Sequence, residues 1–177
     1  MDSFSDPTKN VREFGVSEGQ KVADFGVGSG FYSFALSGMV GDAGKVYAVD
    51  IQKDLLTRLK DEIKRRAIKN IDVIWGDLEA EGGSNLSDDS QDAVIASNIF
   101  FQLENKEIFV SEIKRVLKKG GRVLVVDWSD SYGGMGPHID SVISKEKILE
   151  LFKQTGFSFE REIPAGEHHF GLIFKKV

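Results

Sequence analysis

The chain has 177 residues, of which 41% are hydrophobic and 29% charged, and its formal net charge is −5 at pH 7. This composition excludes a disordered chain and disfavours a dedicated nucleic-acid binder, because such proteins are usually basic. The absence of cysteine excludes disulfides, thiolate metal sites and cysteine nucleophiles, and no apolar run is long enough for a membrane span or a signal peptide, which fits a cytoplasmic protein.

Strand and helix patterns then alternate along the chain. The segment before the first strand, 1–20, has room for one or two helix turns. Short apolar runs predict strands at 22–25, 46–49, 71–75, 93–96 and 123–126. Apolar residues at helical spacing predict helices that begin near Phe31, run from Leu55 to Ala67, and run from Ile108 to Leu117 with a stop at 118–121. The segment 82–90 is a polar loop. This alternation predicts a mostly parallel sheet covered on both faces.

The end of the chain follows a different pattern. Ser144 reads as the N-cap of a helix that ends at Gly156. Two alternating runs, 157–163 and 168–175, are joined by a short loop that contains glycine, and they predict an antiparallel hairpin.

A glycine-rich turn follows the first predicted strand, in VADFGVGSGF at 22–31. Glycine at 26, 28 and 30 lets a ligand approach the backbone, and the helix that begins near Phe31 presents unpaired N–H groups to it. A dinucleotide-binding turn would have its third glycine where Phe31 stands, and no lysine follows as in a P-loop. The turn therefore predicts a site for a nucleotide-like ligand other than these two.

The spacing D-x-G-x-G-x-G from Asp24 to Gly30 resembles the first motif of class I S-adenosylmethionine-dependent methyltransferases. VYAVDIQKDLL and IWGDLEA resemble the next two motifs, and the stretch from Asp92 to Trp128 is similar to the ubiquinone and menaquinone biosynthesis branch. The resemblance implies one domain over 1–177, with a short N-terminal segment, a cofactor-binding half at 22–129 and a substrate side at 130–177. It also implies an α/β three-layer sandwich, a seven-stranded mostly parallel sheet with its last strand antiparallel and helices on both faces.

The resemblance also implies the residues that bind S-adenosylmethionine. Asp50 would hold the ribose hydroxyls, Asp77 the adenine amino group, and Asp24 would lie near the cofactor's amino group. Ser97, Asn98 and Ile99 would line the methionine end. The predicted cofactor site comprises Asp24, Gly26, Gly28, Gly30, Phe31, Tyr32, Asp50, Ile51, Gly76, Asp77, Leu78, Ser97, Asn98 and Ile99.

Each of these residues also has a structural interpretation. Asp24 could cap the glycine turn, Asp50 could be an ordinary strand-end carboxylate, and Asp77 could belong to a plain turn. Tyr32 could face the cofactor or the core. The three carboxylates nevertheless lie at the carboxyl ends of the first three predicted strands, and open α/β sheets bind ligands at that edge. Their common position favours a cofactor site.

Catalysis by such an enzyme consists of aligning a nucleophile with an activated methyl group, so no catalytic side chain is required. Candidates for a base or a substrate contact are His138, His169 and Asp127, because histidine titrates near neutral pH and all three lie after the fifth strand or in the last hairpin. Either His168 or His169 could point toward the substrate pocket or be structural, and the structural interpretation is favoured for His168. No metal site is predicted.

A small or lipid-like methyl acceptor is favoured by the acidic charge and by the branch that the sequence resembles. RNA or protein is the alternative, because the short chain leaves the substrate side open and 64–66 is basic. A partner subunit, such as a second copy in a homodimer, could also complete the site, and a non-catalytic cofactor-binding domain is the third hypothesis. A further hypothesis is that four phenylalanines form an apolar rim around the substrate side, and the alternative is that they pack in the core: Phe4, Phe14, Phe100 and Phe101.

Overall fold

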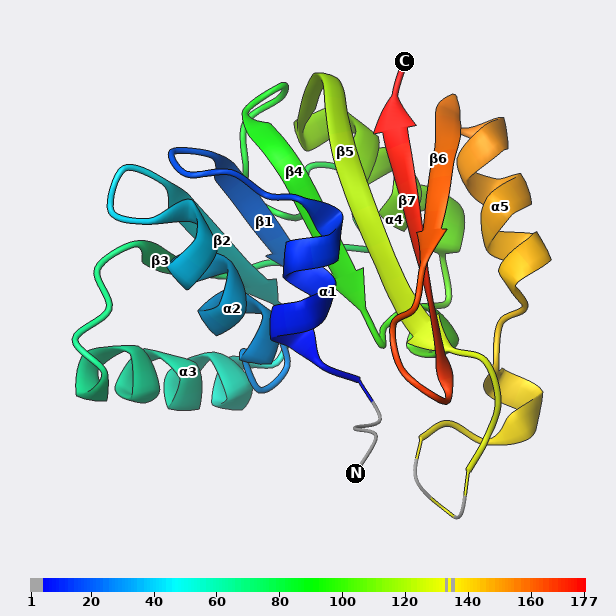
Figure 1. The fold of residues 1–177 in the computed structure, drawn as a ribbon, viewed down its shortest axis with the longest axis horizontal. Helices are drawn as coiled ribbons and strands as arrows, with labels where there is room; N and C mark the ends of the chain where they lie inside the picture. Colours follow the sequence, from blue (N-terminus) through cyan, green and yellow to red (C-terminus); the bar gives the residue numbers. More distant parts are fainter. Residues whose placement is uncertain (1–4, 133, 135) are drawn as a thin grey trace.

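The computed structural model describes residues 5–132, 134 and 136–177. Seven strands form one sheet, in the order β3-β2-β1-β4-β5-β7-β6 (Figure 1). The strands are β1 (Lys21–Phe25), β2 (Lys45–Asp50), β3 (Ile71–Trp75), β4 (Gln91–Ser97), β5 (Leu117–Trp128), β6 (Phe157–Ile163) and β7 (His169–Lys176). The helices are α1 (Pro7–Phe14), α2 (Phe31–Val40), α3 (Lys53–Arg65), α4 (Lys106–Val116) and α5 (Lys145–Gln154), with short 3-10 turns η1 (Phe100–Gln102) and η2 (Ile139–Ser141).

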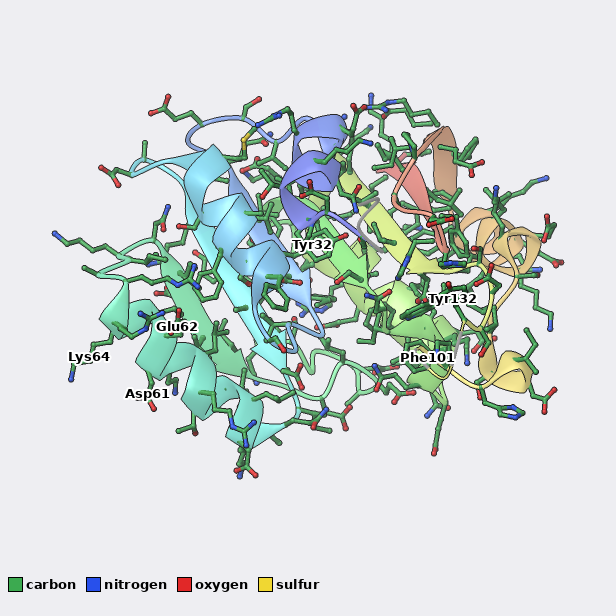
Figure 2. The ribbon with its side chains drawn as sticks, turned by 60° about the horizontal axis from the view of Figure 1, so that its bottom comes forward. Tyr32, Asp61, Glu62, Lys64, Phe101 and Tyr132 are labelled. Atoms are coloured by element: carbon green, nitrogen blue, oxygen red, sulfur yellow. The ribbon has the colours of Figure 1, made fainter. Side chains whose placement is uncertain are left out.

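The first five strands of the chain are parallel, and β7 lies antiparallel between β5 and β6. The predicted seven-stranded sheet with an antiparallel last strand is therefore confirmed. The carboxyl ends of the parallel strands meet at one edge of the sheet, here called the carboxyl edge. It lies at the bottom of Figure 1 and comes forward in Figure 2.

Helices cover both faces of the sheet, as Figure 1 shows. Val22, Ile95 and Leu124 pack with α1, α2 and α3, whereas Ala23 and Val94, one position along, pack on the other face with α4 and α5. Because successive strand residues point to opposite faces, a strand buried on both sides needs a continuous apolar run. This requirement explains why the strands could be recognised in the sequence.

Several predicted element boundaries differ from the structure, and two of these differences are instructive. The helix predicted to reach Ala67 ends at Arg65, and Ala67 is exposed with a left-handed φ of 54°. The stretch 118–121 does not stop α4, because β5 begins at Leu117, which pairs with Gln91 of β4. Leu117 is fully buried, so the chain passes from the helix directly into the strand.

The phenylalanines predicted as a possible rim lie in different environments. Phe14 and Phe100 are fully buried in the two halves of the core, so the rim hypothesis is wrong for them, and their packing alternative holds. Phe101 is partly exposed, and Phe4 lies outside the described residues. Within the described ranges, no helix combines the length and the apolar content that a membrane crossing requires.

Candidate functional site

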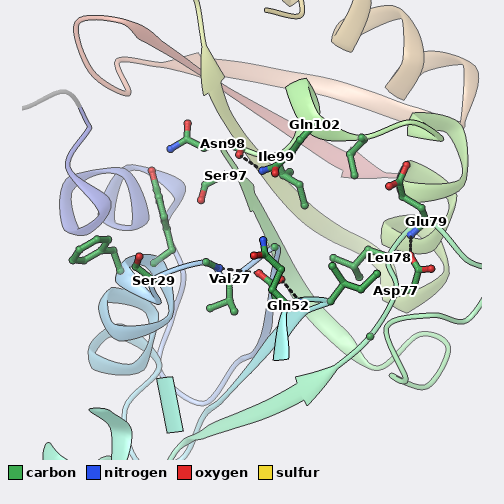
Figure 3. A pocket seen from close by; sticks show the side chains of 18 of the residues that line it. Val27, Ser29, Gln52, Asp77, Leu78, Glu79, Ser97, Asn98, Ile99 and Gln102 are labelled. Carbon is green, nitrogen blue, oxygen red and sulfur yellow. Dashed lines mark hydrogen bonds between the residues drawn. The ribbon is translucent and has the colours of Figure 1, made fainter. Parts of the chain in front are cut away.

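A cavity of about 620 Å³ opens at the carboxyl edge, between the ends of β1, β2, β3 and β4 (Figure 3). Its size is within the range of small-molecule and cofactor sites. The predicted cofactor residues line it, with the exception of Asp24 and Gly30: Gly26, Gly28, Phe31, Tyr32, Asp50, Ile51, Gly76, Asp77, Leu78, Ser97, Asn98 and Ile99. The structure thus brings together residues from four separate parts of the sequence.

The glycine turn forms one wall of the cavity. Gly26 and Gly28 have φ values of 79° and 53°, a left-handed region that side chains other than glycine rarely adopt. A Cβ on Gly26 would lie 2.3 Å from Cδ1 of Ile99, whereas a Cβ on Gly28 would meet nothing closer than 4.0 Å. Gly26 therefore allows two walls of the cavity to pack together, and the backbone at Gly28 is open to a ligand.

We expect Gly26→Ala to weaken binding of S-adenosylmethionine, the cofactor that the sequence motifs imply, about tenfold, because the left-handed backbone and the contact with Ile99 together cost about 1–2 kcal/mol. The matched control is Gly38→Ala in α2, where a Cβ has no neighbour within 4 Å and φ is not left-handed. Isothermal titration calorimetry measures both variants. Equal affinities for the two would show that the position of Ile99 does not shape the site.

Asp50 connects the end of β2 to this turn. Its side chain is only 6% exposed, its Oδ2 accepts a hydrogen bond from the Gly28 N–H at 3.0 Å, and its Oδ1 accepts one from the Gln52 N–H at 2.9 Å. A carboxylate has about four acceptor positions, so both oxygens can still accept from ligand hydroxyls. These acceptor positions suit the two hydroxyl groups of a ribose.

The opposite end of the cavity combines apolar side chains with a second carboxylate. Leu78 is buried, and Ile51 is 53% exposed although it is a large apolar residue. Asp77 accepts a hydrogen bond from the Glu79 N–H at 3.0 Å. An apolar wall beside an acceptor suits a flat heteroaromatic ring that carries an amino group, so these residues fit adenine.

The end of β4 forms the third wall. Asn98 has a left-handed φ of 52°, its N–H donates to the Val126 carbonyl oxygen at 2.8 Å, and its own carbonyl accepts from Gln102 at 3.1 Å. Backbone strain at a residue other than glycine tends to occur at functional sites. Figure 3 shows Ser97 and Asn98 lining the cavity above the glycine turn.

Tyr32 lines the cavity, although only 6% of it is exposed. Its hydroxyl oxygen is 2.8 Å from the Asn10 side-chain nitrogen, which donates to it, and Asn10 also donates to the Ala165 carbonyl oxygen at 3.2 Å. The sequence left open whether Tyr32 faces the cofactor or the core. Its hydrogen bond with Asn10 connects α1 to the cavity wall.

Asp24 and Gly30 lie behind the cavity wall. Asp24 is 1% exposed and accepts a hydrogen bond from the Ser33 hydroxyl at 2.7 Å. Burial raises the pKa of Asp24 to about 6, against the lowering effect of this bond. A Cβ on Gly30 would lie 2.5 Å from Leu59, so glycine here lets α2 and α3 pack closely. The geometry favours the structural interpretation of both residues.

None of the three acid–base candidates lines the cavity. Asp127 is 1% exposed and accepts from the N–H groups of Phe100 and Trp128, and burial raises its pKa to about 6. His138 is exposed and forms a contact with Asp140. His169 is buried, with its ring 4.3 Å from that of Trp128. Among the described residues, no three His, Asp or Glu side chains form a group that could hold a metal.

One pair was missed at the sequence level. His168, interpreted as structural, lies with its Nδ1 2.8 Å from an oxygen of Asp130. The two residues are 38 positions apart, and no spacing in the sequence indicates their contact.

Comparisons with known proteins agree with this geometry. The family described as "Methyltransferase domain" matches residues 16–160. A SAM dependent methyltransferase from Aquifex aeolicus superimposes with a TM-score of 0.90 at 30% identity, covering 98% of this chain and 91% of that one. The fold and the cavity at the carboxyl edge are thus those of a methyltransferase domain. The chain belongs to the methyltransferase domain family.

Two curated relatives are similar over about two thirds of the chain. The ubiquinone/menaquinone biosynthesis C-methyltransferase of Haemophilus ducreyi is 31% identical over 65% of this chain and 44% of its own length. The demethylmenaquinone methyltransferase of Lactococcus lactis is 34% identical over 68% of this chain and 47% of its own length. The chain therefore spans less than half of the length of these relatives.

Proposed function

We propose that this chain transfers the methyl group of S-adenosylmethionine to a small-molecule acceptor by in-line displacement. The observation that carries the proposal is the cavity at the carboxyl edge, which is lined by the Asp50 carboxylate together with neutral side chains that include Phe31, Tyr32 and Ser97. In this proposal the acceptor lies beside the bound cofactor, away from Asp77, which fits adenine.

In this proposal each wall of the cavity has one task. Asp50 holds the ribose, while Gly76, Asp77, Leu78 and Ile51 hold the adenine. The turn from Gly26 to Tyr32 and the segment 97–99 hold the methionine part, and Asp24 and Gly30 support the turn from behind. The bound cofactor supplies a sulfonium-activated methyl group, so these residues need only orient it and exclude water.

The charge around the cavity favours a small acceptor over RNA. The charged side chains that line it are the carboxylates of Asp50, Asp77 and Glu79, which would repel a phosphate backbone. The basic residues 64–66 end α3 just before β3 begins, so they lie at the amino ends of the strands. Figure 2 shows Lys64 and Glu62 far from Tyr32 and Tyr132. Glu62 also pairs with Arg65 at 2.6 Å.

The names of the curated relatives indicate a quinone-type acceptor for those proteins. We propose the same chemical class, a hydroxyl-bearing aromatic ring, for this chain. A protein acceptor and a non-catalytic binding domain are the alternatives that the assay below tests.

Calorimetry with S-adenosylmethionine, S-adenosylhomocysteine and NAD provides the first test. We expect the first two to bind and NAD not to bind. Methyl transfer from labelled S-adenosylmethionine is then measured with naphthohydroquinone, with bulk RNA and with unfolded protein, and label in naphthohydroquinone is expected. Charge reversal at Lys64 and Arg65 should leave this transfer unchanged. If label appeared only in RNA and were lost when the charges of Lys64 and Arg65 are reversed, a small acceptor would be contradicted. If NAD bound and S-adenosylmethionine did not, the proposed cofactor site would be contradicted.

A further inference from the structure

The side-chain oxygen of Asn98 is an unpaired polar atom beside the cavity. Asn98 lines the cavity, and its Oδ1 atom is buried without a hydrogen-bond partner among the described residues. A buried carbonyl oxygen that lacks a donor loses its hydration without compensation, so native proteins almost always supply a partner. The unpaired oxygen therefore points to a ligand that donates a hydrogen bond at this place.

The backbone of Asn98 is already held by the protein. Its N–H donates to the Val126 carbonyl oxygen at 2.8 Å, and its carbonyl oxygen accepts from the Gln102 side chain at 3.1 Å. Its φ of 52° is left-handed, a conformation that asparagine tolerates better than most residues. The part of Asn98 that remains for a ligand is its carboxamide. The χ2 torsion of asparagine is broad, so the carboxamide can turn its oxygen toward a donor in the cavity.

The order of the strands places this carboxamide on the methyl side of the cofactor. In the proposed binding mode adenine lies at the end of β3 and the ribose at the end of β2. The sulfur is bonded to the 5′ carbon of the ribose, so the methyl group lies on the side of the ribose away from adenine. β1 and then β4 follow β2 in the sheet, and two strand spacings amount to about 10 Å.

Figure 3 shows the same arrangement from close by. Asn98, directly after β4, lies beside Ser97, whereas Leu78 and Asp77 lie at the opposite side of the cavity. The described residues that line the cavity include no lysine, arginine or histidine. The donor for Oδ1 must therefore come from the ligand itself, and a hydroxyl group on the methyl acceptor supplies one.

We propose that Asn98 selects the methyl acceptor, an inference that rests on the proposed function. Its Oδ1 accepts a hydrogen bond from the acceptor's hydroxyl group and so places the aromatic ring beside the methyl group. The side chain of Asn98 thus serves the acceptor, while the rest of the segment 97–99 serves the methionine part. A ring whose hydroxyl groups are replaced by ethers would leave Oδ1 unpaired, and sites of this kind discriminate against such analogues.

Calorimetry on the complex with S-adenosylhomocysteine tests this role without requiring turnover. Under anaerobic conditions the wild type should bind naphthohydroquinone about tenfold more tightly than dimethoxynaphthalene, which has no hydroxyl donor. Asn98→Gly adopts the same left-handed backbone without strain and removes Oδ1. It should weaken naphthohydroquinone binding about tenfold and leave dimethoxynaphthalene binding within about twofold. Asn98→Asp retains an acceptor oxygen and should retain the preference for the hydroquinone.

Asn85→Gly is the matched control, because Asn85 also has a left-handed φ, of 58°, but is exposed and lies outside the cavity lining. It should change neither affinity. Binding of S-adenosylmethionine should be unchanged in Asn98→Gly.

Three results would overturn the inference in distinguishable ways. Equal weakening of both aromatic compounds in Asn98→Gly would show that no hydroxyl is bound by Asn98. Weakened S-adenosylmethionine binding with the hydroquinone preference retained would assign the side chain to the methionine ammonium group. If the wild-type complex bound neither aromatic compound, the proposed acceptor class would be contradicted, and this inference would be rejected with it.

Discussion

Asp50→Ala should weaken S-adenosylmethionine binding about 100-fold in calorimetry. The carboxylate is nearly buried and faces the cavity with both oxygens already positioned by the N–H groups of Gly28 and Gln52. Hydrogen bonds to a charged group contribute about 1.5–3 kcal/mol each, and a loss of about 3 kcal/mol corresponds to about 100-fold in Kd. Alanine would also leave the two N–H groups without their acceptor, which loosens the turn.

Asp54→Ala provides the control for this experiment. Asp54 is an exposed acid in the first turn of α3, four residues from Asp50 and outside the cavity lining. Its removal changes the net charge equally and should leave Kd within about twofold, since an exposed charge interacts weakly with a ligand at a distance. An unchanged Kd for Asp50→Ala would place the ribose elsewhere. A large loss in both variants would indicate a general effect of charge.

Most of the fold could be predicted because its determinants are local. A strand buried on both faces, such as β1 or β4, must be apolar throughout, and a tight turn into α2 needs glycine at fixed positions. The errors lie where tertiary contacts decide a boundary. Leu117 is the first residue of β5 because it pairs with Gln91, and the sequence around Leu117 does not indicate this pairing. The helical spacing of its neighbours instead predicted that it ends a helix.

The candidate site could be predicted only in part, for a similar reason. Asp50 and Asp77 follow strands, so the common edge of a parallel sheet brings them together. The depth of Asp24 beneath the turn depends on how α2 packs on β1, which motif spacing does not specify. The contacts of His168 depend on a loop that returns from β5, and those of Glu112 depend on a loop that returns from β3.

The loop after β3 is held by a buried acid of α4. Glu112 is 2% exposed, and its oxygens accept hydrogen bonds from the N–H groups of Gly82 and Ser84 at 3.1 and 3.0 Å. Arg115 donates to both oxygens, at 2.7 and 2.8 Å. Since 76–79 at the start of this loop lines the cavity, Glu112 fixes the proposed adenine end from behind.

Glu112→Gln should destabilise the protein by about 3 kcal/mol, because the N–H groups of Gly82 and Ser84 lose their charged acceptor in a buried position and Arg115 keeps, among the described residues, only the exposed Asp88 as a charged partner. For a chain of this length that corresponds to a decrease of about 6–12 °C in Tm, measured by circular dichroism. Glu107→Gln, an exposed acid in the first turn of α4, is the matched control and should change Tm by about 1 °C or less. Equal losses in the two variants would contradict a specific role for Glu112.

The same pair predicts how stability depends on pH. Burial alone would raise the pKa of Glu112, but the hydrogen bonds from Arg115 and Ser84 outweigh it and lower the pKa from 4.5 to about 2. A carboxyl group with a lowered pKa in the folded state stabilises the fold above its unfolded value, and this contribution is lost as the pH falls through the folded value. The stability difference between wild type and Glu112→Gln should therefore be largest above about pH 5 and shrink toward pH 2. Denaturant unfolding at several pH values measures it, and a difference independent of pH would mean that the charge of Glu112 is not what holds the loop.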